Sequence, residues 1–170
     1  MNKWVWILFG AFFALFFELF CAYNRLALPS VAVLCFYMGA VFGWRRAVVP
    51  FIVVGSVLDL VLGRTVPFTP MLVLLVSPLG ALCSKFSIRS SIGTFSLLGS
   101  TLLCVSIFIL SGVTELFAVT FLSSDGWIYT LWSHAVFTVS PFILTPTFIF
   151  ILDKIAPSMD VASLRQTISE

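Results

Sequence analysis

Asp59 is the one acidic residue in a long apolar stretch, VVGSVLDLVLGRT at positions 53–65. Gly55 lies four residues before it and Gly63 four residues after it. In a helix the spacing i, i+4, i+8 places all three residues on one face. Small residues on such a face let the backbone of a second helix approach closely, as in helices that pack within membranes. The pattern therefore predicts a packing face with a carboxylate at its centre.

A carboxylate in this position requires a compensating group. Ionisable side chains within apolar helices face the interior of a bundle and find partners there, and the negative end of the helix dipole repels an acid. Arg64, which follows in the next loop, and Arg25 are the two candidate partners. Three interpretations stay open: a structural polar contact inside the bundle, a contact with a protein partner, and a site for a substrate or an ion.

Glu18 is the second candidate. It lies near the end of the first apolar stretch, at a depth similar to that of Asp59. A polar cluster of Glu18 with Arg25 and Arg64 is one expectation. The simpler expectation is that the Glu18 side chain extends outward to the membrane interface, as long charged side chains do.

Catalytic and metal-binding patterns are missing from the sequence. His134 is the only histidine, and none of the four cysteines forms a C-x-x-C pair, so no metal site is expected. No G-x-S-x-G motif and no phosphate-binding loop occur. We therefore expect no enzyme, no catalytic residue, no cofactor and no small-molecule ligand. The net charge of +2 and the scattered basic residues also argue against nucleic acid as a partner.

Composition indicates an integral membrane protein. Hydrophobic residues make up 61% of the 170 residues, charged residues only 9%, and the mean hydropathy is +1.16. A soluble domain of this length would be about a quarter charged. This chain has too little polar surface to cover itself, so membrane lipid is expected to be its main solvent.

Six apolar stretches are candidate transmembrane helices: 4–21, 28–44, 47–62, 66–83, 92–110 and 130–152. They are continuously apolar rather than alternating, which favours helices over the strands of a membrane barrel. The prediction is an all-α bundle of about six transmembrane helices over residues 1–155, followed by a polar cytoplasmic tail at 156–170.

The fifth stretch raises a question of its own, because residues 92–122 are too long for one upright helix. Either the helix continues outward or residues 114–122 lie at the membrane interface as an amphipathic segment. The second alternative is preferred.

Basic residues determine the expected orientation, since Lys and Arg are enriched in cytoplasmic loops. With the N-terminus inside, only Arg25 and Arg64 lie outside. The remaining basic residues are then cytoplasmic: Lys3, Arg45, Arg46, Lys85, Arg89, Lys154 and Arg165. Both termini are expected in the cytoplasm.

The stretch PFIVVGSVLDLVLGRT resembles a motif of the rod shape-determining protein MreD family. In that family a glycine lies four residues before an Asp-Leu pair that is followed by x-x-Gly near the end of the third span. The matching positions here are Gly55, Asp59, Leu60 and Gly63. The layout of the chain is also similar, with about six spans and Pro29 opening the second.

The resemblance implies a non-catalytic subunit in the bacterial cell inner membrane that belongs to the cell-elongation (rod-shape, lateral peptidoglycan synthesis) complex. The implied partners are the periplasmic scaffold protein MreC, the actin-like MreB, and the polymerase and transpeptidase of wall synthesis. The residues expected to form its structural or partner-binding polar face are Gly55, Asp59, Leu60, Gly63, Arg64 and Glu18.

The resemblance also implies a fold similar to the S components of energy-coupling-factor vitamin transporters. The alternative function is therefore a substrate-binding S component of such a transporter. That alternative predicts an outer cavity lined by Glu18, Asn24, Asp59 and His134.

Overall fold

The computed structural model describes residues 3–26, 28–64, 66–86, 92–118 and 135–159. Within these ranges the chain is helical and contains no strand, which confirms the all-α prediction. The elements in chain order are α1 (Lys3–Tyr23), α2 (Ser30–Phe42), α3 (Trp44–Val61), α4 (Phe68–Phe86), α5 (Ile92–Ala118), α7 (Pro141–Ile155) and the short 3-10 helix η3 (Ala156–Met159). Residues 135–139 are also helical and lead into α7 through a turn at Ser140.

Four helical segments are long and apolar enough to cross a membrane: Lys3–Tyr23, Phe68–Lys85, Ile92–Gly112 and Ala135–Ile155. The other two of the six predicted stretches differ for physical reasons. Helix α2 has 13 residues, which gives it a length of about 20 Å against about 30 Å for the hydrocarbon core of a bilayer. Helix α3 has 18 residues, but they include Arg45, Arg46 and Asp59.

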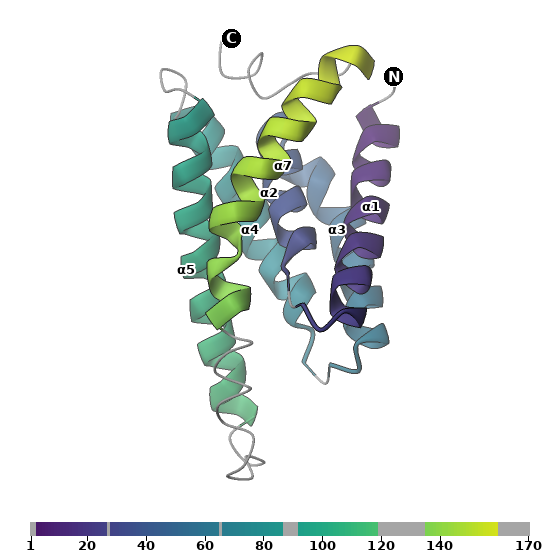
Figure 1. Ribbon diagram of the computed structural model, residues 1–170, viewed down its shortest axis with the longest axis vertical. Helices are drawn as coiled ribbons and strands as arrows, with labels where there is room; N and C mark the ends of the chain where they lie inside the picture. Colours follow the sequence, from purple (N-terminus) through teal and green to yellow (C-terminus); the bar gives the residue numbers. More distant parts are fainter. Residues whose placement is uncertain (1–2, 27, 65, 87–91, 119–134, 160–170) are drawn as a thin grey trace.

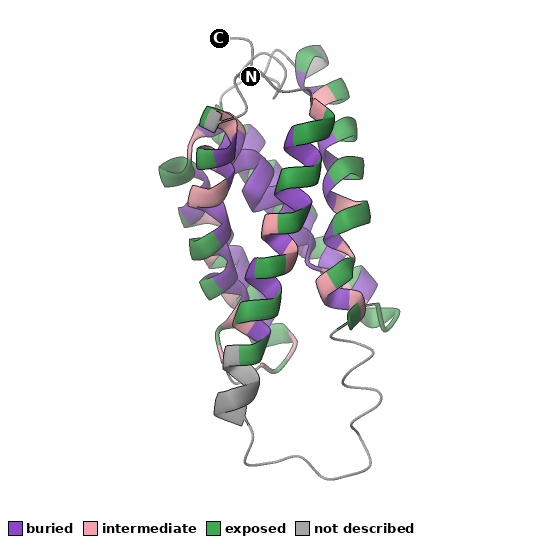
Figure 2. Cartoon of the chain, turned by 90° about the vertical axis from the view of Figure 1, so that its left-hand side faces the viewer, coloured by how far each residue is buried: buried purple, intermediate pink, exposed green. Residues whose placement is uncertain are grey.

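Helix α2 is the centre of the bundle. Twelve of its 13 residues are buried, and it contacts α1, α3, α4, α5 and α7. A helix that is apolar and buried on all sides is surrounded by other elements. The surrounding helices instead bury one side and expose the other, as the alternating colours in Figure 2 show.

Helices α2 and α4 pack with their backbones in close contact. A Cβ atom added at Gly39 would lie 2.6 Å from the carbonyl oxygen of Ser77, and one added at Gly80 would meet the carbonyl oxygen of Phe36. Neither position has room for a side chain. These two glycines therefore set the distance between α4 and the central helix.

Helix α5 continues without a break to Ala118. Its 27 residues span about 40 Å, which exceeds the thickness of the bilayer core. Figure 1 shows α5 reaching beyond its neighbours at the end where α1 finishes. The preferred expectation, an interfacial segment at 114–122, is therefore wrong for residues 114–118, and residues 119–122 lie outside the described part of the chain.

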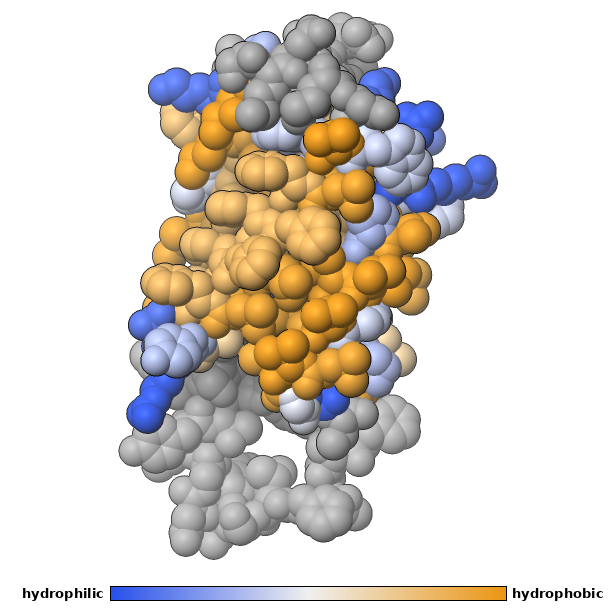
Figure 3. Space-filling model, turned by 90° about the vertical axis from the view of Figure 1, so that its right-hand side faces the viewer, coloured by the Kyte–Doolittle hydropathy of each residue, from blue (hydrophilic) through white to orange (hydrophobic). Residues whose placement is uncertain are grey.

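The bundle has two chemically different ends. Helices α1 and α3 finish, and α2 and α4 begin, at what we call the carboxylate end, because Glu18 and Asp59 lie there (lower end in Figure 1). At the opposite, basic end lie Lys3, Arg45, Arg46, Lys85 and Lys154. Between the two ends Figure 3 shows a broad apolar band.

Candidate functional site

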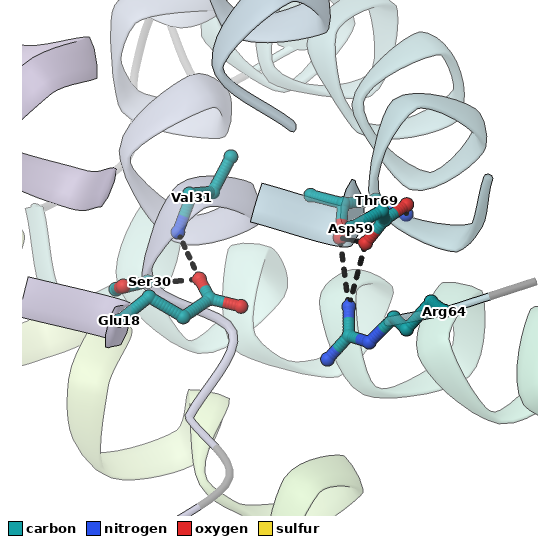
Figure 4. A network of polar contacts seen from close by, with 6 residues as sticks. All are labelled: Glu18, Ser30, Val31, Asp59, Arg64 and Thr69. Atoms are coloured by element: carbon teal, nitrogen blue, oxygen red, sulfur yellow. Dashed lines mark hydrogen bonds and ion pairs between the residues drawn. The ribbon is translucent and has the colours of Figure 1, made fainter. Parts of the chain in front are cut away.

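Asp59 joins the last turn of α3 to the first turn of α4. Its side chain is buried, and the residue is only 4% exposed. Oδ1 accepts hydrogen bonds from Arg64 Nη1 at 2.9 Å and from Thr69 Oγ1 at 2.6 Å, and Oδ2 accepts one from the Thr69 backbone N–H at 2.8 Å. Figure 4 shows the three side chains converging. We call Asp59, Arg64 and Thr69 the α4 latch.

Arg64 is the compensating group of Asp59, with an Nη1–Oδ1 distance of 2.9 Å. The same nitrogen also donates to Thr69 Oγ1 at 2.9 Å. The guanidinium carbon lies 5.7 Å from the centre of the Phe68 ring, within the range of a cation–π contact. The carboxylate is thus matched by an ion pair and by two donors from α4, as a buried charge requires.

A tight turn after α3 returns Arg64 to the carboxylate. The Arg64 N–H donates to the carbonyl oxygen of Asp59 at 2.9 Å, and the Gly63 N–H donates to that of Leu60 at 3.2 Å. This pair of bonds is a Schellman motif, which needs a left-handed residue at its C′ position. Gly63 supplies it with φ of 66°. The expectation that Gly63 continues the helical packing face is therefore wrong, since α3 ends at Val61.

The predicted packing face is present at Gly55. A Cβ atom there would lie 3.0 Å from Thr69 Cγ2 and 3.3 Å from the Pro70 backbone nitrogen, so the start of α4 rests directly on α3. Leu60, the neighbour of Asp59 in the motif, is 79% exposed. Gly55 and Asp59 therefore contact α4 on the inner side of α3, whereas Leu60 is exposed on the outer side.

Glu18 makes an equivalent contact with α2. It is 4% exposed, and its Oε2 accepts hydrogen bonds from the Val31 backbone N–H at 2.9 Å and from Ser30 Oγ at 3.1 Å (Figure 4). The expectation that Glu18 extends to the interface is wrong, because the first turn of α2 offers donors that have no partner within that helix. We call Glu18, Ser30 and Val31 the α2 latch.

The sequence analysis anticipated Arg64 as a partner of Asp59, but it missed the donors from the first turns of α2 and α4, which are Ser30, Val31 and Thr69. Ser30 follows Pro29 directly, and Thr69 lies two residues after Pro67. Proline at the start of a helix and a hydroxyl residue beside it are typical of helix N-termini. That signal predicts where α2 and α4 begin, but it does not say which distant acid meets them.

A pocket of about 300 Å³ lies at the carboxylate end. Its polar lining comes from Glu18, Arg25 and Arg64. Its apolar lining comes from Ala22, Leu26, Leu28, Leu62 and Phe137. The predicted cluster of one acid and two arginines therefore exists as the wall of a pocket.

The cavity expected for a transporter subunit matches this pocket only at Glu18. The described lining does not include Asn24 or Asp59, and His134 lies outside the described residues. In the part of the chain that the structure describes, no group of three His, Cys, Asp or Glu residues could hold a metal ion.

Comparison of the chain with protein-family models, with curated proteins and with solved structures found no match. The two latches and the pocket are therefore interpreted from their own chemistry.

Proposed function

We propose that the chain is a non-catalytic subunit of the cell-elongation complex in the bacterial inner membrane, and that it docks the membrane segment of the scaffold protein MreC. The observation that carries the proposal is the two-sided motif at the end of α3. Gly55 and Asp59 fix α3 to α4, while Leu60 is exposed beside them. Such an arrangement presents an apolar side chain on a rigid frame.

The apolar band supports insertion into a bilayer (Figure 3). A run of exposed aromatic residues lies on α1, and a run of exposed aliphatic residues lies on α3, which contacts α1. These residues are Phe9, Phe12, Phe13, Phe16 and Phe20 on α1, and Val49, Val53, Val57, Leu60 and Val61 on α3. Continuous apolar surface of this kind requires lipid or a partner to cover it.

The distribution of basic residues supports an orientation with the basic end in the cytoplasm. In this proposal the chain crosses the inner membrane several times and has both termini inside. The carboxylate end then faces the periplasm. The α4 latch and Leu60 lie near the periplasmic leaflet, where a periplasmic scaffold with a membrane anchor would meet them.

Docking would use the exposed ridge of α3. Val53, Val57 and Leu60 are spaced i, i+4, i+7, which places them on one face. Helices associate in membranes through close van der Waals packing, because lipid tails are as apolar as the side chains. A ridge held in place by the α4 latch loses little further freedom when a partner helix packs against it. MreB, the polymerase and the transpeptidase belong to the same proposed assembly.

The test compares two exposed leucines. Leu60→Trp enlarges the ridge beside the latch, and Leu97→Trp makes the same change on α5, where Leu97 is 66% exposed. Each full-length variant is expressed in a rod-shaped cell that depends on this chain. We expect Leu60→Trp to reduce co-purification with tagged MreC and to widen the cells, and Leu97→Trp to leave both unchanged.

Thermal unfolding in detergent is the control for folding, and both tryptophan variants are expected to melt like the wild type. Asp59→Leu supplies a second line of evidence, because it disturbs the frame rather than the ridge. Normal MreC co-purification and normal cell width in both Leu60→Trp and Asp59→Leu would contradict the proposal.

A further inference from the structure

The pocket at the carboxylate end has walls of both charges. Glu18 supplies a carboxylate, and Arg25 and Arg64 supply guanidinium groups. Its volume of about 300 Å³ falls at the lower end of the range for small-molecule sites, roughly 300–1,000 Å³. Glu18 and Arg64 also belong to the two latches, whereas Arg25 lines the pocket without joining two helices.

Glu18 uses only one of its oxygens to hold α2. Both hydrogen bonds of the α2 latch go to Oε2. Within the described ranges no hydrogen bond reaches Oε1, and Figure 4 shows this oxygen directed away from α2 toward the side on which Arg64 lies. Because Glu18 lines the pocket, a ligand there that carries a hydrogen-bond donor can reach this oxygen.

Arg25 is held in place by its backbone. The Leu26 N–H donates to the carbonyl oxygen of Cys21 at 2.8 Å, and the Arg25 N–H donates to that of Ala22 at 3.0 Å. These bonds form a second Schellman motif, with Arg25 as its left-handed residue at φ of 60°. In the described part of the chain Arg25 makes no ion pair, and its side chain lines the pocket.

The charges around the pocket sum to zero. Glu18, Arg25 and Arg64 line the pocket, and Asp59, which lies outside the lining, pairs with Arg64, so two acids stand against two arginines. A pure anion would meet the carboxylate of Glu18, and a pure cation would meet two guanidinium groups. A molecule with a positive and a negative group joined by a short linker fits both walls at once. An ammonium group donates hydrogen bonds to Oε1, and a phosphate accepts them from the arginines.

We infer that this pocket binds the headgroup of an amine-bearing phospholipid, with its ammonium group at Glu18 and its phosphate at Arg25 and Arg64. The inference rests on the membrane embedding in the proposed function, which places this end of the bundle at the bilayer interface. Leu26 lines the pocket and is half exposed, so the apolar wall continues to the outer surface, where acyl chains would lie.

The experiment measures which lipid the purified full-length chain retains. The protein is reconstituted with equal amounts of phosphatidylethanolamine and phosphatidylcholine that carry the same acyl chains, and bound lipid is counted by native mass spectrometry. The trimethylated amine of phosphatidylcholine cannot donate a hydrogen bond to Oε1. We expect the wild type to retain phosphatidylethanolamine about tenfold over phosphatidylcholine, the ratio expected for one charge-assisted hydrogen bond.

Three variants locate the site. Glu18→Gln keeps an oxygen for Ser30 and Val31 but loses the charge, so the tenfold preference is expected to disappear while the melting temperature holds. Arg25→Asn keeps a residue that tolerates the left-handed backbone, and it is expected to lower retention of both lipids. Arg46→Gln, at the basic end, is the matched control and is expected to change neither.

A second experiment tests whether the pocket binds the intact lipid or a soluble molecule with the same headgroup. Glycerophosphoethanolamine is added to delipidated protein, and thermal stabilisation is compared with that given by the intact lipid. Weaker stabilisation by the soluble headgroup supports the lipid, whereas equal stabilisation overturns the lipid and leaves a soluble zwitterion as the ligand.

Equal retention of the two lipids by the wild type, or an unchanged preference in folded Glu18→Gln, overturns the pocket chemistry itself. None of these measurements involves MreC, so they fail or succeed independently of the docking test on Leu60.

Discussion

The α2 latch and the α4 latch follow one plan with one difference. In each, an acid near the end of one helix accepts a backbone N–H and a hydroxyl from the first turn of the next helix. Each acid is followed by a Schellman turn, with Arg25 after α1 and Gly63 after α3. Only the α4 latch also contains an arginine that pairs with its acid.

The difference lies in how many carboxylate oxygens receive hydrogen bonds. Asp59 is satisfied on both oxygens by Arg64 and Thr69, so the α4 latch is closed. Glu18 is satisfied on one oxygen and lines a pocket with the other side of its carboxylate. In both latches an acid holds two helices together. In the α2 latch Arg25 lies in the pocket wall instead of pairing with the acid, so one oxygen of Glu18 remains without a donor from the described residues.

The largest effect is expected from Asp59→Leu. This change leaves the Thr69 N–H without its acceptor and Arg64 without its counter-charge, although Arg64 can still donate to Thr69 Oγ1. We expect a loss of about 3 kcal/mol in the free energy of unfolding, the lower end for a broken buried pair because the Arg64 side chain is 30% exposed. Chemical denaturation in detergent measures it. Asp59→Asn retains one acceptor and should lose less; an unchanged Asp59→Leu would show that the α4 latch is not stabilising.

Glu18→Leu is expected to lower the free energy of unfolding by about 1–3 kcal/mol, because the Val31 N–H loses its acceptor but no ion pair is broken. The Ser30 hydroxyl can still donate to the carbonyl oxygen of Ala14 at 3.2 Å. The same denaturation experiment ranks it against Asp59→Leu. Glu18→Gln is the matched control and should stay close to the wild type. If Glu18→Leu proves the more damaging of the two leucine variants, the distinction between a closed and an open latch is wrong.

Gly55→Ala tests the residue that lies four positions before Asp59. The new Cβ would press on Thr69 Cγ2 and Pro70 N. We expect the overpacking cost, about 2 kcal/mol, to exceed the gain of about 1 kcal/mol in helix propensity, which leaves a net loss of stability of about 1 kcal/mol. The equivalent position before Glu18 is Ala14, which is fully buried and already carries a Cβ. Thermal unfolding of Gly55→Ala and Gly55→Ser should show a graded loss, and a stabilised Gly55→Ala would contradict the close contact.

The smallest effects concern the two Schellman turns and should have opposite signs. Gly63→Ala places a side chain on a residue with left-handed backbone conformation and should lower the free energy of unfolding by about 1 kcal/mol. Arg25→Gly removes such a side chain and should gain less than about 1 kcal/mol. Paired melting curves measure both. If both variants changed the melting temperature in the same direction, backbone strain would not distinguish the two turns.

The sequence was sufficient to predict the helices and one polar contact. Continuous apolar stretches predict helices whatever their neighbours, and the spacing of Gly55, Asp59 and Arg64 is local, so the packing face and the ion pair could be anticipated. Residue Gly63 was misplaced for a local reason. Its spacing fits a helix, but the glycine ends the helix by adopting φ of 66°.

The α2 latch could not be read from the sequence in the same way. Glu18 meets Val31, which is 13 residues away and on another helix, so its environment depends on tertiary packing. An isolated acid near the end of an apolar helix can be hydrated by water or can accept hydrogen bonds from a buried donor. The amino-acid composition does not indicate which of the two occurs. The end of α2 is set by the conformation of Gly43. The end of α5 was not marked in the sequence, because apolar residues continue beyond Gly112.

Gly43 is the entire connection between α2 and α3, with φ of 87° and ψ of 142°. A one-residue link has no slack, so α3 cannot slide along its axis without pulling on α2, which is surrounded by five other helices. A force applied along α3 would therefore be shared by the whole bundle at once, and α3 would respond as part of a stiff unit rather than as a separately movable helix.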